Sequence, residues 1–239
     1  MTWSIVAWDA ATGQLAVAVA SRFFAVGALC PAIRAGKGAL STQALINPLY
    51  ARDGLAALDE GLDPQAVVAR LVGADGGREV RQLHVVDSKG RSAQHTGREC
   101  VPWCGHRAGP GYSMAGNMLA GPRVLEETER AYVAGGSLRF AERLMSAMEA
   151  GEAAGGDKRG KQGAAIVIHG AEEYPLLSLR VDDHPEPLAE LRRLHAASLE
   201  RFQAFMQCLP TRADPTGIID RAEIDARVAR FQAERAKLA

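Results

Sequence analysis

Two thiols and two imidazoles form the sharpest cluster of metal-binding side chains in the sequence. Cys100 and Cys104 lie four positions apart, and His95 and His106 flank them. Thiolate and imidazole are the ligands of tetrahedral zinc sites. The spacing is irregular for such a site, so the set predicts either a zinc-binding loop or, more simply, buried thiols beside surface histidines.

Polar side chains also follow the ends of expected strands. Ser21 and Arg22 come directly after an apolar run, and a hydroxyl beside a guanidinium could hold a substrate carboxylate. Gln43 ends another run and could donate a hydrogen bond to a substrate carbonyl. Each has a structural alternative: a strand-end serine, a solvated arginine, and an amide that satisfies neighbouring backbone.

Two glycine-containing segments offer donors and charge. Gly116 and Asn117 combine a backbone N–H with a side-chain amide, a pair that can stabilise an oxyanion. The glycines of segment 155–160 let backbone approach a ligand while Asp157 and Arg159 present charge. The alternatives are a turn and an exposed loop. No glycine run has the GxGxxG or GxxxxGK[ST] pattern, which disfavours a nucleotide enzyme.

Hydrophobic patterning predicts the elements that would position these residues. Apolar, β-prone runs predict strands over residues 3–8, 14–20, 29–34, 39–44, 82–87, 91–95, 164–169 and 176–181. Helical spacing predicts helices over residues 50–60, 64–73, 124–133, 138–150, 187–208 and 221–238. We expect the first four strands to share one antiparallel sheet and residues 97–121 to form a glycine-rich loop. Grouped strands and helices favour an α+β fold, a four-layer αββα sandwich of two antiparallel sheets.

Composition limits the function of this 239-residue chain. Lysine plus arginine and aspartate plus glutamate number 28 each, so no global field attracts nucleic acid or an anionic membrane. No uncharged apolar stretch approaches the roughly 20 residues that span a bilayer. The start lacks a signal-peptide pattern and cysteines are few, so we expect a cytoplasmic protein without disulfides. No cofactor is expected. Residues 1–208 are expected to form the main domain, and residues 209–239 a helical tail.

The chain resembles domain-of-unknown-function family 1028 (DUF1028), which is grouped with the N-terminal nucleophile (Ntn) hydrolases. The resemblance implies the same αββα fold. It extends from residue 2 to about residue 194 and is carried, in order, by the segments TWSIVAWDAATGQLAVAVASRFFAVG, GALSTQALINPLY, RQLHVVDSKGR, HTGREC, GNMLAG, AGGDKRGKQGAA and RVDDHPEPLAELRRL.

The resemblance implies a chemical role for Thr2. In Ntn enzymes the first residue of the mature chain attacks a carbonyl, and its own α-amine, with a pKa of about 8, accepts the hydroxyl proton. Thr2 is small enough for methionine removal to expose it. The leading hypothesis is an amidohydrolase for a small amide or peptide-like substrate, in which Asn117 holds the oxyanion and Arg22 or Arg159 anchors an acidic substrate. We expect Thr2, Ser21, Gln43 and Asn117 to surround one cleft.

Two other functions stay open. A retained Met1 would convert the required amine into an amide, which favours a noncatalytic binding or assembly protein on the same scaffold. A zinc protein is the third alternative; the family pattern supports Cys100 and His106, whereas Cys104 stands where a small residue is usual. We also expect a homo-oligomer, because apolar helices at 138–150 and 187–208 would leave hydrophobic surface for a partner.

Overall fold

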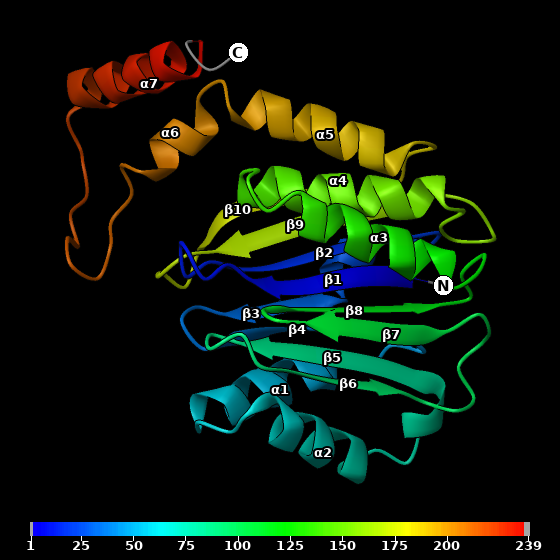
Figure 1. Ribbon diagram of the computed structural model, residues 1–239. Helices are drawn as coiled ribbons and strands as arrows, with labels where there is room; N and C mark the ends of the chain where they lie inside the picture. Colours follow the sequence, from blue (N-terminus) through cyan, green and yellow to red (C-terminus); the bar gives the residue numbers. More distant parts are fainter. Residues whose placement is uncertain (1, 237–239) are drawn as a thin grey trace. The chain divides into compact units, whose positions relative to one another are not determined.

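Two antiparallel sheets stack face to face in the computed structural model, which describes residues 2–236 (Figure 1). The six-stranded sheet contains β1 (Thr2–Trp8), β2 (Leu15–Ser21), β7 (Gly105–Gly109), β8 (Tyr112–Asn117), β9 (Gly163–His169) and β10 (Pro175–Val181). Its order is β10-β9-β2-β1-β8-β7. The four-stranded sheet contains β3 (Pro31–Arg34), β4 (Gly38–Ala44), β5 (Arg81–Asp87) and β6 (Ser92–Thr96), in that order.

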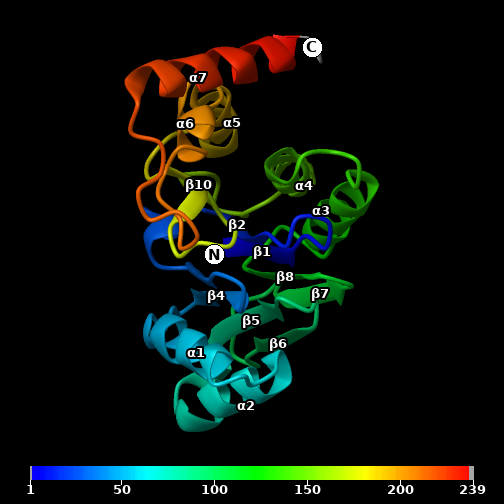
Figure 2. The same cartoon turned by 90° about the vertical axis from the view of Figure 1, so that its left-hand side faces the viewer.

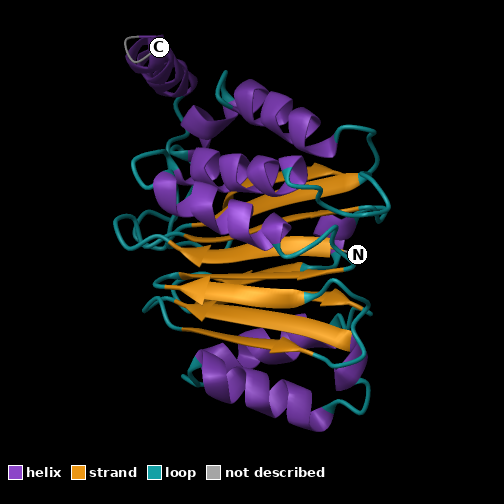
Figure 3. Cartoon of the chain, turned by 45° about the vertical axis from the view of Figure 1, so that its right-hand side comes forward, coloured by secondary structure: helices purple, strands orange, loops and turns teal. Residues whose placement is uncertain are grey.

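Helices cover the outer face of each sheet. α1 (Leu49–Asp59) and α2 (Pro64–Ala74) pack on the four-stranded sheet, and α3 (Arg123–Ala134) and α4 (Phe140–Ala153) on the six-stranded sheet (Figures 2 and 3). Asp63 begins α2 by accepting a hydrogen bond from the backbone N–H of Ala66, and Pro64 occupies the first turn. The predicted four-layer αββα sandwich is confirmed.

β1 lies between β2 and β8 and is buried on both faces. Val6 points between the sheets, where it packs with Val17 and Val86. Because side chains alternate along a strand, Thr2 and Ser4 point the same way as Val6. A strand that is covered on both faces is apolar at successive positions, which explains the continuous run in the sequence.

Three expectations about the elements were wrong. The first four strands do not share a sheet: the connection between β2 and β3, which contains the short 3-10 turn η1 (Val26–Ala28), leads from one sheet to the other. The expected loop 97–121 contains β7 and β8. The expected helix 187–208 is two helices, α5 (Pro187–Ser198) and α6 (Phe202–Met206).

The chain forms two compact units, and their boundary lies between Leu191 and Arg192. This boundary falls within α5, and the expected division into residues 1–208 and 209–239 stays a prediction. The second unit contains the C-terminal part of α5 together with all of α6 and α7 (Arg221–Ala236). Within this unit an ion pair of 2.9 Å joins Arg201 to Asp225. Within residues 2–236, no helix is long and apolar enough to cross a membrane.

Candidate active site

The layer between the two sheets changes from apolar to polar along β1. Val6, Leu15 and Val86 fill the end far from Thr2. At the other end the inward side chains are polar and almost fully buried: Thr2, Ser4, Gln43, Gln82, His84, Ser113 and Asn117. Buried polar groups destabilise a fold unless they are hydrogen-bonded, so this end needs a complete set of partners.

Three residues predicted for the site meet around the fourth, Thr2. The Thr2 hydroxyl donates to Ser21 Oγ at 3.1 Å. Gln43 Nε2 and Asn117 Nδ2 donate to the Thr2 carbonyl oxygen at 3.3 and 3.4 Å. All four side chains belong to residues exposed by 4% or less. They therefore form a buried cluster rather than the walls of an open cleft.

The two amides have no hydrogen left for a substrate. An amide nitrogen carries two hydrogens. Asn117 Nδ2 gives its second to Gln82 Oε1 at 2.9 Å, and Gln43 Nε2 gives its second to the same oxygen at 3.0 Å. In this arrangement neither side chain is the predicted donor to an oxyanion or to a substrate carbonyl. Both instead hold the carbonyl of Thr2.

The three charged residues predicted to bind substrate contact one another. The buried carboxylate of Asp157 accepts from the backbone N–H groups of Arg22 and Arg159, each at 2.8 Å, and pairs with the Arg159 guanidinium at 3.2 Å. The Arg22 guanidinium donates to the Arg159 carbonyl. Asp157 thereby fixes the loop before β9 to the end of β2.

A small pocket of about 120 Å³ opens beside this loop. Its lining includes Trp3, Ser21, Asp157, Gly160 and Lys161. The Lys161 ammonium pairs with Glu152 at 3.0 Å, so the pocket contains both signs of charge. Because Ser21 accepts from the Thr2 hydroxyl, the pocket begins one hydrogen bond away from that hydroxyl.

Backbone strain is concentrated at the same strand ends. Among residues 2–236, three residues other than glycine have positive φ: Ala25 (51°), Ala44 (69°) and Met118 (52°). Ala44 follows Gln43, Met118 follows Asn117, and Ala25 lies in the loop after Ser21. The left-handed conformation costs a residue with a Cβ about 1 to 2 kcal/mol, and such outliers cluster at functional sites.

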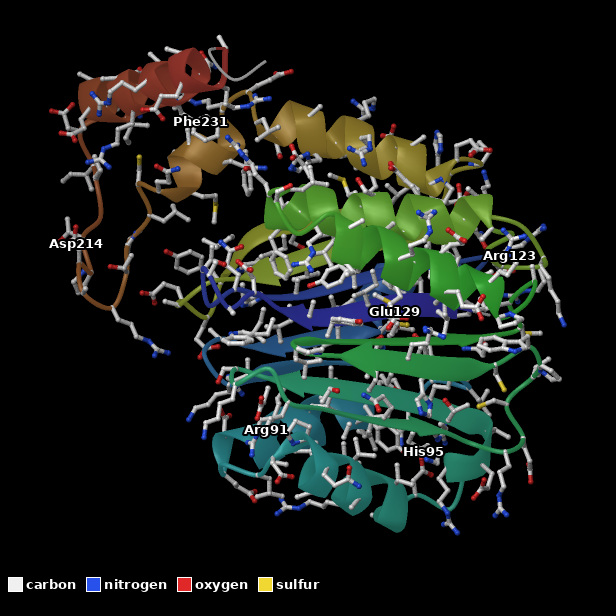
Figure 4. The ribbon with its side chains drawn as sticks, viewed as in Figure 1. Arg91, His95, Arg123, Glu129, Asp214 and Phe231 are labelled. Atoms are coloured by element: carbon white, nitrogen blue, oxygen red, sulfur yellow. The ribbon has the colours of Figure 1, made fainter. Side chains whose placement is uncertain are left out.

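The possible zinc ligands do not converge. His95, labelled in Figure 4, contacts the Arg78 carbonyl through Nε2 at 2.8 Å, and His106 contacts Thr96. Burial raises the pKa of Cys100 to about 11, which favours the protonated thiol over the thiolate that binds metal. In the part of the chain that the structure describes, no three His, Cys, Asp or Glu side chains are placed to hold an ion.

Four residues of the buried cluster were not predicted from the sequence: Ser4, Gln82, His84 and Ser113. They lie inside strands, and although Ser4, Gln82 and His84 fall within the family-like segments, no spacing of chemical groups singles them out. The available signal was the alternation of polar residues at 82 and 84 in an otherwise apolar strand. Burial lowers the pKa of His84 to about 3, so its imidazole is neutral at neutral pH.

Comparison with known proteins supports the family assignment. The profile of a family of unknown function, DUF1028, matches residues 2–191. A DUF1028 protein from Silicibacter pomeroyi superposes with a TM-score of 0.85 at 30% identity, over 92% of this chain and 96% of that chain. No curated protein matches the chain.

Two ancestral β-subunit (Anbu) structures are more distant. The protein from Yersinia bercovieri has a TM-score of 0.39 at 12% identity, over 82% of this chain and 94% of its own. A Gly-1 mutant from Hyphomicrobium sp. strain MC1 has a TM-score of 0.42 at 13% identity, over 83% and 95%. Likeness at this level carries no conclusion about activity. The family match and the Silicibacter structure are sufficient for one statement: the chain belongs to the DUF1028 family.

Proposed function

We propose that the protein is an amidohydrolase in which Thr2 is an N-terminal nucleophile acting on a small amide or peptide-like substrate. The observation that carries the proposal is the fixation of Thr2 at the polar end of the inter-sheet layer. Its hydroxyl is held by Ser21 and its carbonyl by two amides. The strained residues that follow Gln43 and Asn117 support a functional site at this end.

The chemistry requires that removal of Met1 frees the α-amine of Thr2. The amine then takes the proton of Oγ1, and Oγ1 attacks the carbonyl carbon of the amide. When the C–N bond breaks, the leaving nitrogen takes a proton from the ammonium group, and an ester on Thr2 remains. Water hydrolyses this ester and restores the hydroxyl.

The neighbouring groups have distinct proposed roles. Ser21 orients the hydroxyl, while Gln43 and Asn117 fix the backbone that carries both hydroxyl and amine. This replaces the oxyanion role first expected for Asn117. The pocket beside Ser21 would hold a group of only a few heavy atoms, which favours a small substrate. Asp157, which lines this pocket, holds the backbone of Arg22 and the guanidinium of Arg159. The guanidinium of Arg22 or Arg159 would anchor an acidic group of the substrate.

A β-lactone probe tests the nucleophile directly. Attack by Thr2 opens the lactone and leaves the whole probe attached as an ester, so the intact mass rises by the mass of the probe. We expect labelling at Thr2, mapped by peptide mass spectrometry, in protein whose N-terminus is Thr2. Thr2→Ser should be labelled, and Thr2→Ala should fold but lose labelling by orders of magnitude.

The matched control is protein that retains Met1, in which Thr2 keeps its hydroxyl but its nitrogen is an amide, so it should not react. Equal labelling of wild type and Thr2→Ala would contradict the proposal. One observation favours a second function, a noncatalytic binding or assembly protein: Thr2 is only 4% exposed. An absence of labelling in protein that begins at Thr2 would favour this second function.

A further inference from the structure

The hydrogen bonds around Thr2 continue through side chains to a fully buried histidine. Backbone carbonyls only accept hydrogen bonds, so they fix which end of each amide is nitrogen. The Thr2 carbonyl orients Gln43 and Asn117, and the Gly116 carbonyl, at 2.8 Å from Gln82 Nε2, orients Gln82. The remaining atom of the Gln43 amide, Oε1, then faces Ser4 Oγ at 2.5 Å.

These orientations determine where the proton of His84 lies. Gln43 Oε1 only accepts, so the Ser4 hydroxyl donates to it. Ser4 has no second hydrogen for His84 Nε2 at 2.8 Å, so Nε2 carries the proton and donates to Ser4. A neutral imidazole has one N–H; Nδ1 therefore accepts, and Ser113 Oγ at 3.2 Å donates to it.

We propose that His84 is a positioning residue for Thr2: its Nε2–H fixes Ser4, Ser4 fixes the amide of Gln43, and that amide holds the Thr2 carbonyl. The functional role of this series of hydrogen bonds rests on the proposed function, because a nucleophile needs such exact placement. Burial, the largest cause, lowers the pKa of His84 to about 3 and keeps it in the required neutral form, although a hydrogen bond with the backbone of Ser113 acts to raise that pKa. His106 is the titratable group that acts on it electrostatically, and it lowers the same pKa.

The apolar end of the same layer argues against a merely structural role. There Val6, Val17 and Val86 hold the two sheets together without any polar group. Continuing that packing would avoid the desolvation of several hydroxyls, amides and an imidazole. The polar residues instead form a connected set next to Thr2, and each bond in the set determines the direction of the next.

Nitrogen NMR of the imidazole tests the proton position in the whole protein. We expect His84 Nε2 to resonate as a protonated nitrogen and Nδ1 as an acceptor, with no change over the range of about pH 5 to 8 in which an exposed histidine titrates. We also expect NMR of the same sample to show an ordered resonance for the side-chain amide of Gln43. A proton on Nδ1, or titration of the ring in this range, would overturn the proposal.

Variants then separate positioning from packing. His84→Gln keeps an N–H that can donate to Ser4, whereas His84→Leu fills similar space without a donor. We expect His84→Leu to lose the ordered Gln43 resonance and to slow β-lactone labelling of Thr2 by on the order of a hundredfold, and His84→Gln to restore both. The controls are His169→Leu and His169→Gln, which change a buried histidine that pairs with Leu15 at the other end of the sheet.

The readouts distinguish two failures. If wild type is not labelled but Gln43 loses its order only in His84→Leu, the proposed hydrolase activity fails and the positioning chain stands. If wild type is labelled and both His84 variants label equally fast, or if Gln43 is unaffected by His84→Leu, the positioning role is wrong. Should His84→Leu not fold, the proton position in wild type still decides, together with Gln43 order and labelling rate in His84→Gln, both of which should match wild type.

Discussion

At the residue scale, the N–H groups of two buried amides determine what those side chains can bind. Asn117 and Gln43 have the right type and place for donors to a substrate, but both hydrogens of each amide nitrogen are used on Thr2 and Gln82. Both amides therefore support the backbone of Thr2 and have no N–H left for a substrate.

The burial of His84 makes the free energy of unfolding depend on pH in acid. Its pKa is about 3 in the folded protein and about 6.5 in an unfolded chain, so below pH 6.5 the unfolded state binds the extra proton. The free energy of unfolding therefore falls as pH decreases through this window. Between neutral pH and pH 5 we expect wild type to lose about 2 kcal/mol more than His84→Gln, at about 1.4 kcal/mol per pH unit. Urea unfolding at several pH values measures this, and parallel curves for the two proteins would contradict it.

Eight of the ten strands within residues 2–236 could be predicted from the sequence, and β7 and β8 could not. β2 and β9 have continuous apolar runs, and the predicted bounds of both strands differ from the observed bounds by no more than one residue. β7 and β8 read Gly-His-Arg-Ala-Gly and Tyr-Ser-Met-Ala-Gly-Asn, which lack the β-branched residues of ordinary strands. β8 is a strand because it pairs with β1, and β7 because it pairs with β8, and periodicity does not reveal such tertiary pairing. This is also why Ser113 was missed.

The close approach of α3 and α4 depends on a glycine. A Cβ at Gly151 of α4 would lie 2.2 Å from Thr128 Oγ1 and 3.0 Å from Trp3 Nε1. Both neighbours are buried, so Gly151→Ala should destabilise the fold by about 1 to 3 kcal/mol. Gly73→Ala in α2 is the matched control, since nothing lies within 4 Å of its added Cβ. That change should stabilise the helix by about 0.5 to 1 kcal/mol. Similar melting temperatures for the two variants would contradict the assignment of this contact.

At the scale of the whole molecule, the expected homo-oligomer stays a prediction. We expected the helix at 138–150 to offer apolar surface to a partner, but α4 does not. Phe140, Leu144 and Met148 are buried within the first unit. Large apolar side chains are exposed instead in the loops after β2 and β4, where Phe24 and Leu45 are each more than 60% exposed. These loops follow the strand ends that meet at Thr2.

Sedimentation velocity tests this expectation. We expect the 25.4 kDa chain to sediment as an oligomer, and Phe24→Ser to shift it toward monomer because apolar area on the contact surface is lost. Ile219→Ser is the control, since Ile219 is also highly exposed but lies in the second unit. Wild type that sediments only as monomer at working concentration would reject the oligomer.

The position of β1 between β2 and β8 affects when Thr2 becomes buried during synthesis of the chain. Thr2 pairs with Asn117 of β8, so during synthesis β1 has β2 beside it early but lacks its second neighbour until more than a hundred further residues have been made. At typical rates of about 5 to 20 residues per second, that interval lasts roughly 6 to 23 seconds. Once β8 has paired, Thr2 is buried. We therefore expect the removal of Met1 that the proposed function requires to be fastest during this interval, on the growing chain.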